Sequence, residues 1–397
     1  MQTGQSRQVT CENIYEFESD SVRLPIVIDW TDISTSTSRT QSGDDLVLVG
    51  PVSQKYMSVL NEHASFDLSS LGCFNDGVSP IPLCTCFDLN EVRNHLSSDF
   101  VVQNNIDFLR CNQQIQSHGW NSGAGWVPIG DETGGGSPPA NSFIGNLDGQ
   151  NNFIANLFIN KPEDDSVGFF GSVYGYTSEI KNVGFTKVDI IGQNQVGGII
   201  GAFQYGSIHN SYVIGNIEGN SVVGGLVGRG YGGISNSYTK GSVVSISSVP
   251  SSSVGGLIGA TSYSPNLTNS YSLSTVRGSG RVGGLVASAH GFKIVNSYFG
   301  GRIESESGSV GGLVGFESGH PDNDLENSYW NTETSGQSDA VGSGSSLGGV
   351  GLTTQQMKQR SSFTGFDFSN TWQIQEGQSY PFLRNVPRPS PLPGAND

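Results

Sequence analysis

The chain has 397 residues, of which 14% are charged and 56 are glycine, and its formal net charge is −16. This composition is typical of short apolar strands joined by Gly, Ser and Asn turns, and it excludes an architecture of helices with long charged faces. The acidic balance disfavours nucleic acid and anionic membranes as partners, and no apolar run reaches the roughly 18 residues of a membrane span.

The first 83 residues do not repeat and are predicted to form a small β-rich N-terminal region, with strands at 23–30 and 45–50. Residues 84–153 differ, because Leu89, Val92 and Leu96 are spaced as on one helix face, behind Asp88 as the expected N-cap. We predict that 84–153 is an N-terminal cap, since a helix over the first turn protects the open end of stacked strands.

The five cysteines all lie within the first 111 residues. Cys84 and Cys86 have no second pair and no nearby histidine at zinc-finger spacing, which disfavours a metal site. In an oxidising compartment we expect the disulfides Cys86–Cys111 and Cys73–Cys84, and buried free thiols are the alternative.

Residues 154–329 contain a tetrad that returns every 27 to 31 residues, as in Gly225-Leu226-Val227-Gly228. A fixed period of this length predicts an all-β parallel β-helix, or β-solenoid, of about seven rungs. The apolar pair of each tetrad is predicted to fill the interior, and its glycines to permit a tight corner. The tetrads begin at Gly168, Gly198, Gly225, Gly256, Gly284 and Gly312.

A second theme, Ile/Leu-x-Asn, alternates with the tetrad and is mostly followed by Ser-Tyr. Its asparagines are predicted to stack from rung to rung with their amides bonded along the axis. The tyrosines two residues later are expected to stack in the same way. We interpret both columns as structural ladders and not as ligand contacts. The predicted ladder is Asn156, Asn182, Asn210, Asn236, Asn269, Asn296 and Asn327.

Residues 330–386 leave the repeat and are predicted to form a C-terminal cap at the other end of the stack. A short helix is expected at 352–358, followed by aromatic strand or turn segments at 363–368 and 372–374. Residues 387–397 form a Pro-rich tail of polyproline type.

The repeats Val-Gly-Gly-Leu-Val-Gly and Ile-x-Asn-Ser-Tyr resemble the GLUG motif of bacterial and archaeal surface proteins. The likeness extends to the opening segment, through Trp126 to Gly130 and Leu147 to Gly149, and to the closing segment from Leu352 to Leu383. The resemblance implies a secreted or surface-attached β-solenoid, a fold frequent in adhesins and in some secreted peptidases. Those peptidases carry a zinc-binding His-Glu-x-x-His, which this sequence lacks.

Parallel β-helices also host polysaccharide-active enzymes, which need two or three carboxylates that converge on one face. The candidate sets are Glu163, Asp164 and Asp165, and Glu304, Glu306 and Glu326. Their different spacing from the asparagine ladder favours solvated turn charges over a catalytic set.

Hard oxygen ligands for calcium are offered by Asp322, Asp324 and Glu326. The segment lacks the glycine-containing loop of known calcium sites, so no cofactor is expected, with calcium kept as the alternative.

The sequence favours a non-enzymatic extracellular or cell-surface adhesion protein, whose solenoid binds a glycan or a surface protein. One alternative is a self-assembling subunit of an extracellular filament or surface layer, in which the N-terminal region or the tail engages the next copy. Another alternative is a β-helix polysaccharide-active enzyme.

Overall fold

The structure is a computed structural model, and it describes residues 7–10, 25–28, 73–109, 123–133, 137–262, 266–305, 307–345 and 348–387. The chain divides into two compact units, Met1–Cys73 and Phe74–Asp397. In the first unit the described strands are β1 (Arg7–Thr10) and β2 (Pro25–Ile28), which pair antiparallel. The strand predicted at 45–50 lies outside the described residues, as does the tail beyond residue 387.

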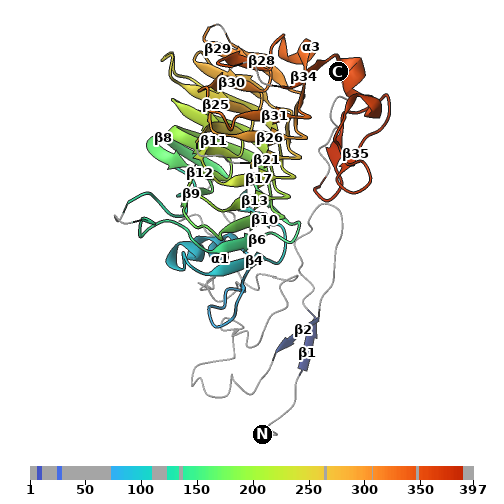
Figure 1. Ribbon diagram of the computed structural model, residues 1–397. Helices are drawn as coiled ribbons and strands as arrows, with labels where there is room; N and C mark the ends of the chain where they lie inside the picture. Colours follow the sequence, from blue (N-terminus) through green and yellow to red (C-terminus); the bar gives the residue numbers. More distant parts are fainter. Residues whose placement is uncertain are drawn as a thin grey trace, which may run out of the picture. The chain divides into compact units, whose positions relative to one another are not determined.

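The second unit is a coil of parallel strands whose successive turns build three long sheets (Figure 1). The first sheet consists of β3 (Ile81–Leu83), β4 (Asp99–Val102), β6 (Asn146–Asp148), β10 (Glu179–Lys181), β13 (Ser207–His209), β17 (Gly233–Ser235), β21 (Asn266–Thr268), β26 (Lys293–Val295) and β31 (Asp324–Glu326). The second consists of β9 (Phe170–Val173), β12 (Ile200–Phe203), β16 (Val227–Gly230), β20 (Ile258–Ser262), β25 (Val286–His290), β30 (Val314–Glu317) and β33 (Val341–Ser343).

The third sheet is the widest, because most turns contribute more than one segment to it. It consists of β5 (Ile106–Asp107), β7 (Phe153–Ala155), β8 (Phe158–Val167), β11 (Gly184–Gly197), β14 (Tyr212–Gly219), β15 (Val222–Gly224), β18 (Tyr238–Ser245), β19 (Ser253–Gly255), β22 (Tyr271–Ser272), β23 (Thr275–Arg277), β24 (Arg281–Gly283), β27 (Tyr298–Phe299), β28 (Arg302–Glu304), β29 (Ser309–Gly311), β32 (Tyr329–Asn331) and β34 (Val350–Leu352). These sheets confirm the predicted parallel β-solenoid of about seven turns.

The described helical elements are short and lie near the two ends of the coil. They are α1 (Cys86–Glu91), η3 (Val92–Asn94), α3 (Thr332–Ser335), α4 (Thr354–Met357) and η4 (Arg360–Ser362). Near the C-terminus β35 (Trp372–Gln373) and β36 (Phe382–Leu383) form a separate antiparallel pair. Within the described ranges, no helix has the length and apolar character needed to cross a bilayer.

Each tetrad fills the interior with its middle pair, and backbones approach closely at glycines where a tetrad begins, such as Gly224 and Gly225. Leu226, Leu257 and Leu285 are completely buried in one continuous core. A Cβ on Gly224 would lie 2.0 Å from the Val227 carbonyl oxygen, and one on Gly225 2.2 Å from that of Gly256. Backbone atoms cannot yield as a flexible side chain can, so these corners accept glycine alone.

Six of the seven predicted ladder asparagines occupy equivalent corners after strands of the first sheet. Asn182, Asn210, Asn236, Asn269, Asn296 and Asn327 all have positive φ, between 46° and 53°. Asn tolerates this left-handed conformation better than most residues, so the corner itself selects it. At the base of the column, Asn210 Nδ2 donates to Asn182 Oδ1 at 3.0 Å, and Asn182 Nδ2 donates to Asp148 Oδ1 at 3.0 Å.

Asn156 does not belong to this column, contrary to the sequence prediction. It follows β7 of the third sheet, and its amide donates to Asp107 Oδ1 at 2.7 Å. The Ile-Ala-Asn triplet imitates the repeat, but the register pairs Ile154 with Phe185 and not with Ile180. The corner beneath Asn182 is instead taken by Gly149, whose N–H donates to the Lys181 carbonyl.

A column of buried serines, next to the asparagines, forms a hydrogen-bonded spine that the sequence analysis did not identify. Ser237 Oγ accepts a hydrogen bond from the Ser211 N–H at 3.2 Å and donates one to the carbonyl of Ser235, on the same turn, at 2.8 Å. The same pair of bonds recurs at Ser211 and Ser270. Each hydroxyl thus satisfies a backbone donor of the rung before it and a carbonyl of its own rung.

The tyrosine column stacks as predicted over four rungs. The rings of Tyr212, Tyr238, Tyr271 and Tyr298 lie 4.9 to 5.0 Å apart, with interplanar angles of 2° to 7°. They form a second apolar core outside the coil. Burial raises the pKa of Tyr271 and Tyr298 well above the ordinary value, so both phenols stay neutral.

The C-terminal region covers this tyrosine column as well as the end of the stack (Figure 1). β33 and β34 add the last strands to two sheets. Residues 358–387, here named the C-terminal strap, then pack Trp372 5.9 Å from the rings of both Tyr271 and Tyr298. The strap accepts hydrogen bonds from Tyr329, Tyr298 and Tyr238 in turn. The predicted cap therefore also covers one side of the solenoid. Without it the apolar tyrosine column would be exposed to solvent.

The solenoid also begins earlier than residue 154, where the repeat pattern starts. β3 and β4 already pair in the first sheet, on either side of α1. These first turns are filled by Phe100, Trp126 and Phe143 and not by the tetrad, which hides them from a repeat search. The N-cap of α1 is Thr85, and Asp88 is the third helical residue of the capping box, which corrects the predicted N-cap.

We predict that Ser237→Ala destabilises the solenoid by about 1–3 kcal/mol, because it leaves the buried Ser211 N–H without its acceptor. Chemical denaturation followed by circular dichroism measures this change. Ser248→Ala, at an exposed position, is the matched control and should change stability by about 0.5 kcal/mol or less. Equal effects of the two substitutions would contradict a spine role for Ser237.

A second prediction compares the hydroxyl contributions of Tyr271 and Tyr298, which are neighbours in the tyrosine column. Among the described residues the buried Tyr271 hydroxyl has no hydrogen-bond partner, whereas Tyr298 Oη donates to the Pro381 carbonyl at 2.6 Å. Tyr271→Phe should therefore stabilise the fold or leave it unchanged, and Tyr298→Phe should cost about 0.5–1.5 kcal/mol. Denaturation midpoints of the two variants check this, and a reversed order would refute the assignment.

Candidate functional site

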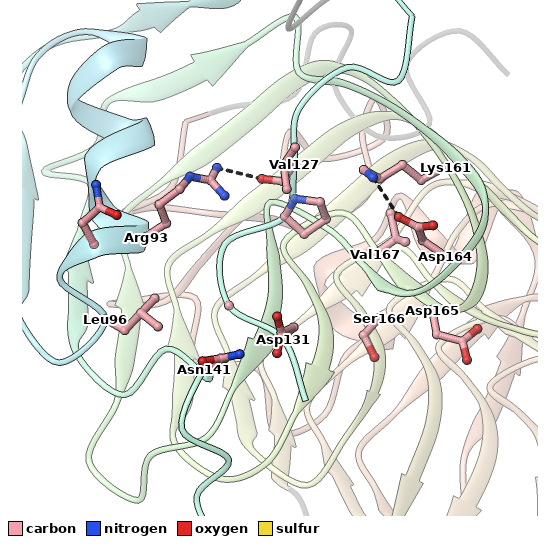
Figure 2. A pocket seen from close by; sticks show the side chains of 13 residues that line it. Arg93, Leu96, Val127, Asp131, Asn141, Lys161, Asp164, Asp165, Ser166 and Val167 are labelled. Carbon is pink, nitrogen blue, oxygen red and sulfur yellow. Dashed lines mark hydrogen bonds and ion pairs between the residues drawn. The ribbon is translucent and has the colours of Figure 1, made fainter. Parts of the chain in front are cut away.

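One described pocket with charged side chains in its lining lies between η3, the segment 127–131 and the end of β8. Figure 2 shows Arg93 from the cap on one wall and Lys161, Asp164 and Asp165 on the other. Its volume is about 440 Å³, enough for a small ligand or part of a larger one.

The cationic groups of this pocket are already engaged. Arg93 Nη2 donates to the Val127 carbonyl at 2.9 Å, and its guanidinium lies 5.1 Å from the centre of the Trp126 ring. Lys161 Nζ pairs with Asp164 Oδ2 at 2.7 Å (Figure 2). Arg93 therefore links η3 to the segment that carries Trp126 and Val127, and the ion pair leaves Lys161 partly neutralised.

The acidic groups do not form a general acid and base pair. Asp131 Oδ1 accepts hydrogen bonds from the backbone N–H and hydroxyl of Thr133. Burial raises the pKa of Asp131, but hydrogen bonds from Thr133 and Asn141 outweigh this effect and hold it below the ordinary value. A glycosidase acid requires a raised pKa, so Asp131 has the opposite tuning. Glu163, Asp164 and Asp165 are exposed, and Glu163 does not line the pocket.

The second set of carboxylates considered for catalysis is dispersed. Glu304 lies on β28 of the third sheet and pairs with Arg302 at 3.1 Å. Glu326 lies on β31 of the first sheet, and Glu306 falls outside the described residues. The structure therefore does not bring Glu304 and Glu326 together on one face.

Two of the three candidate calcium ligands form ion pairs with one lysine, and the third lies near a histidine. Asp324 and Glu326 flank Lys293 Nζ at 3.5 and 3.3 Å, and Asp322 lies 3.7 Å from His320 Nδ1. A lysine ammonium between two carboxylates occupies the place that a cation would take. Among the described residues, the one group of three potential metal ligands is Cys73, Cys84 and Asp88.

That cysteine group is explained by disulfide chemistry. Cys73, Cys84 and Cys86 are each disulfide-bonded, and Cys73 is joined to Cys84. Cys111, the predicted partner of Cys86, lies outside the described residues. Asp88 is held by the capping box, where its carboxylate accepts from the Cys84 and Thr85 N–H groups at 2.9 Å. Oxidised cysteines do not offer thiolate ligands, so this group does not fit a metal.

Glu317, at the end of β30, is a buried carboxylate that the sequence analysis missed. It is 2% exposed and accepts hydrogen bonds from Asn323 Nδ2 and from the N–H groups of Gly319 and Ser345. Burial raises its pKa, but these bonds outweigh the effect and place it below the ordinary value. The carboxylate thus fixes the turn that carries Asp322, which is a structural use of this segment.

Residues 192–218 match the GLUG motif. The chain carries the GLUG motif. The matched stretch includes one tetrad and one Asn-Ser-Tyr corner, so the GLUG motif here corresponds to one turn of the solenoid.

Two sequence relatives match parts of this chain. A Gly-rich membrane protein, provisionally so named, from Evansella cellulosilytica is 39% identical over 106 residues, which are 26% of this chain and 12% of that protein. Halomucin from Haloquadratum walsbyi is 34% identical over 91 residues, 23% of this chain and 1% of halomucin. The matched part of this GLUG-motif chain thus spans 12% or less of the length of these curated relatives.

A solved structure shares the fold. It is a Bacteroides ovatus protein provisionally described as an immunoglobulin A1 protease, with a TM-score of 0.59 and 19% sequence identity. The match covers 80% of this chain and 95% of that one. At this identity the likeness concerns the β-solenoid architecture and not the activity.

We predict that Glu317→Gln destabilises the fold at pH 7 by about 1–3 kcal/mol, because the ionised carboxylate receives several buried hydrogen bonds. The folded-state pKa lies below the ordinary 4.5, so this contribution is present above about pH 4.5 and is lost as the pH falls through the folded-state value. Denaturation at pH 7, 4.5 and 3 should show the difference between wild type and variant shrinking in acid.

The matched control for this substitution is Glu304→Gln, at a partly exposed carboxylate paired with Arg302. It should change stability by about 1 kcal/mol or less. A Glu317→Gln effect that is independent of pH would contradict the assignment.

Proposed function

We propose that this chain is a non-enzymatic module of a cell-surface protein, in which the solenoid wall binds a glycan or another surface protein. The observation that carries the proposal is that the repeated polar side chains are consumed by the stack itself. The asparagines take left-handed corners, the serines satisfy backbone groups and the tyrosines stack under the strap. Each additional repeat therefore lengthens the outer surface of the solenoid, which suits presentation of a binding surface.

The relatives support the surface location. One is named as a membrane protein and the other as halomucin, and each matches about a quarter of this chain at 26% and 23% coverage. The acidic net charge of −16 suits an exposed, hydrated surface and disfavours attachment to phosphate-rich polymers.

The enzyme alternative has little geometric support. The pocket carboxyl Asp131 has a lowered pKa, and Asp164 is held in an ion pair with Lys161. The protease description of the Bacteroides ovatus structure does not extend to this chain, since the fold alone is shared.

Binding and catalysis are tested together with the full chain. Beads coated with the protein are applied to immobilised polysaccharides and to immobilised extracellular proteins, and the supernatants are assayed for released reducing ends and peptides. We expect saturable retention on at least one surface without product release. Beads coated with heat-unfolded chain are the control. Absence of retention on every surface, or turnover of a substrate, would overturn the proposal.

The filament alternative is tested by negative-stain microscopy of the purified full chain. A surface module that works as a single particle should appear dispersed at all concentrations tested. Ordered filaments or sheets would favour the self-assembling subunit over the proposed function.

A further inference from the structure

Four tyrosines cluster at one corner of the solenoid, outside both apolar cores. Tyr174 and Tyr176 follow β9, Tyr205 follows β12 and Tyr231 follows β16, so the group spans three successive turns of the second sheet. We name this group the tyrosine ledge. Tyr205 lies 4.2 Å from Tyr176 in a stacked arrangement, 5.5 Å from Tyr174 and 6.5 Å from Tyr231.

The ledge is more open than the tyrosine column on the flank, because Tyr176 is exposed and Tyr174, Tyr205 and Tyr231 are partly buried. Tyr176 is 76% exposed, which is the largest exposure among the exposed large apolar and aromatic side chains of the described residues. Tyr205 covers one face of the Tyr176 ring, and the exposure of Tyr176 leaves its other face to solvent.

The backbone at the ledge is held in a conformation that tyrosine seldom adopts. Tyr205 has φ of +85°, in the left-handed region where bulky residues are rare. Strand register places Ala289 three turns after Phe203, and the residue two positions after Ala289 is Gly291, with φ of +63°. Glycine thus serves this corner elsewhere in the same coil. A tyrosine placed there at a backbone cost indicates a use for its ring.

The surroundings of the ledge carry almost no charge. Residues 168–178 and 198–208 contain no charged side chain, and residues 225–235 contain only Arg229. Polar groups are present at the rim, where Ser137 Oγ lies 2.7 Å from Tyr174 Oη. The rest of the chain is acidic, with a net charge of −16, so an anionic ligand would be repelled and an uncharged one would not.

From this geometry we infer that the tyrosine ledge binds a neutral polysaccharide, with a sugar ring stacked on the outward face of Tyr176. A pyranose has an apolar C–H face and a rim of hydroxyls, which match an aromatic face bordered by phenol and serine hydroxyls. A polymer laid along the axis would meet aromatic groups on successive turns, spaced about 4.8 Å apart. The inference deepens the proposed function and rests on it, because it names one ligand class and one site for surface binding.

The test measures binding of the full chain to neutral polysaccharides by affinity electrophoresis, with cellulose derivatives, xylan, mannan, soluble starch and glycol chitin, and with polygalacturonate as the anionic comparison. We expect retardation by at least one neutral polymer and none by polygalacturonate. Tyr176→Ala should weaken that binding about two- to tenfold, the range that one aromatic contact supplies.

Three further variants separate the ring from the fold. Tyr176→Trp keeps an aromatic face and should retain binding, whereas Tyr205→Gly suits the left-handed backbone but removes the stacked partner and should weaken binding while the chain stays folded. Ile246→Ala removes an exposed apolar side chain elsewhere, 62% exposed, and should leave binding unchanged. Circular dichroism of each variant confirms that the fold is intact.

The failures of the two proposals are distinguishable. If a polysaccharide binds and Tyr176→Ala binds it equally well, the ledge is not the site, although the surface-binding function stands. If the wild type binds an immobilised protein and no polysaccharide, the ligand class is wrong and the proposed function stands. If neither class binds, the proposed function fails and the ledge inference fails with it.

Discussion

The whole fold depends on the pairing of each backbone turn with the turns above and below it. Parallel register places like residues over one another, so any side chain that recurs in sequence becomes a column in space. The buried serines show the strictest form of this constraint, because Ser237 bonds both its own turn and the N–H of Ser211 on the turn before. Glycine corners, left-handed asparagines and stacked tyrosines all follow from the same superposition.

Sequence reasoning was strongest where the register repeats and weakest where it is broken. The tetrads and the asparagine theme predicted a coil of about seven turns, and the sheets confirm it. Asn156 was misplaced because a local triplet does not reveal which turn it pairs with. The first turns were missed because Phe100 and Trp126 fill them without a periodic signal. A repeat in the sequence shows which residues lie one turn apart. These errors arose in individual turns whose sequence departs from the repeat.

The candidate sites were less accessible from sequence, since they depend on which side chains meet across turns. Asp164 and Asp165 were predicted to lie in a turn but belong to β8, and the pocket wall formed by Arg93 required η3 to be placed against that strand. Glu317 gave no signal, because its partner Ser345 follows the strand of the next turn and its partner Asn323 belongs to a loop outside the repeat pattern. The exposed tyrosines follow the tetrads in sequence, yet only their packing and the φ of Tyr205 distinguish them from the buried column.

The C-terminal strap gives this solenoid a coupling that a simple repeat array lacks. In such an array each turn contacts only its neighbours, so the end turns can detach one at a time. Here one segment accepts hydrogen bonds from Tyr329, Tyr298 and Tyr238. Tyr329 and Tyr298 lie on adjacent turns, and Tyr238 lies two turns before Tyr298. Peeling the last turn away therefore requires the strap to leave several turns together. Under a pulling force on that end, the last turns should therefore unfold together as one cooperative unit and not one turn at a time.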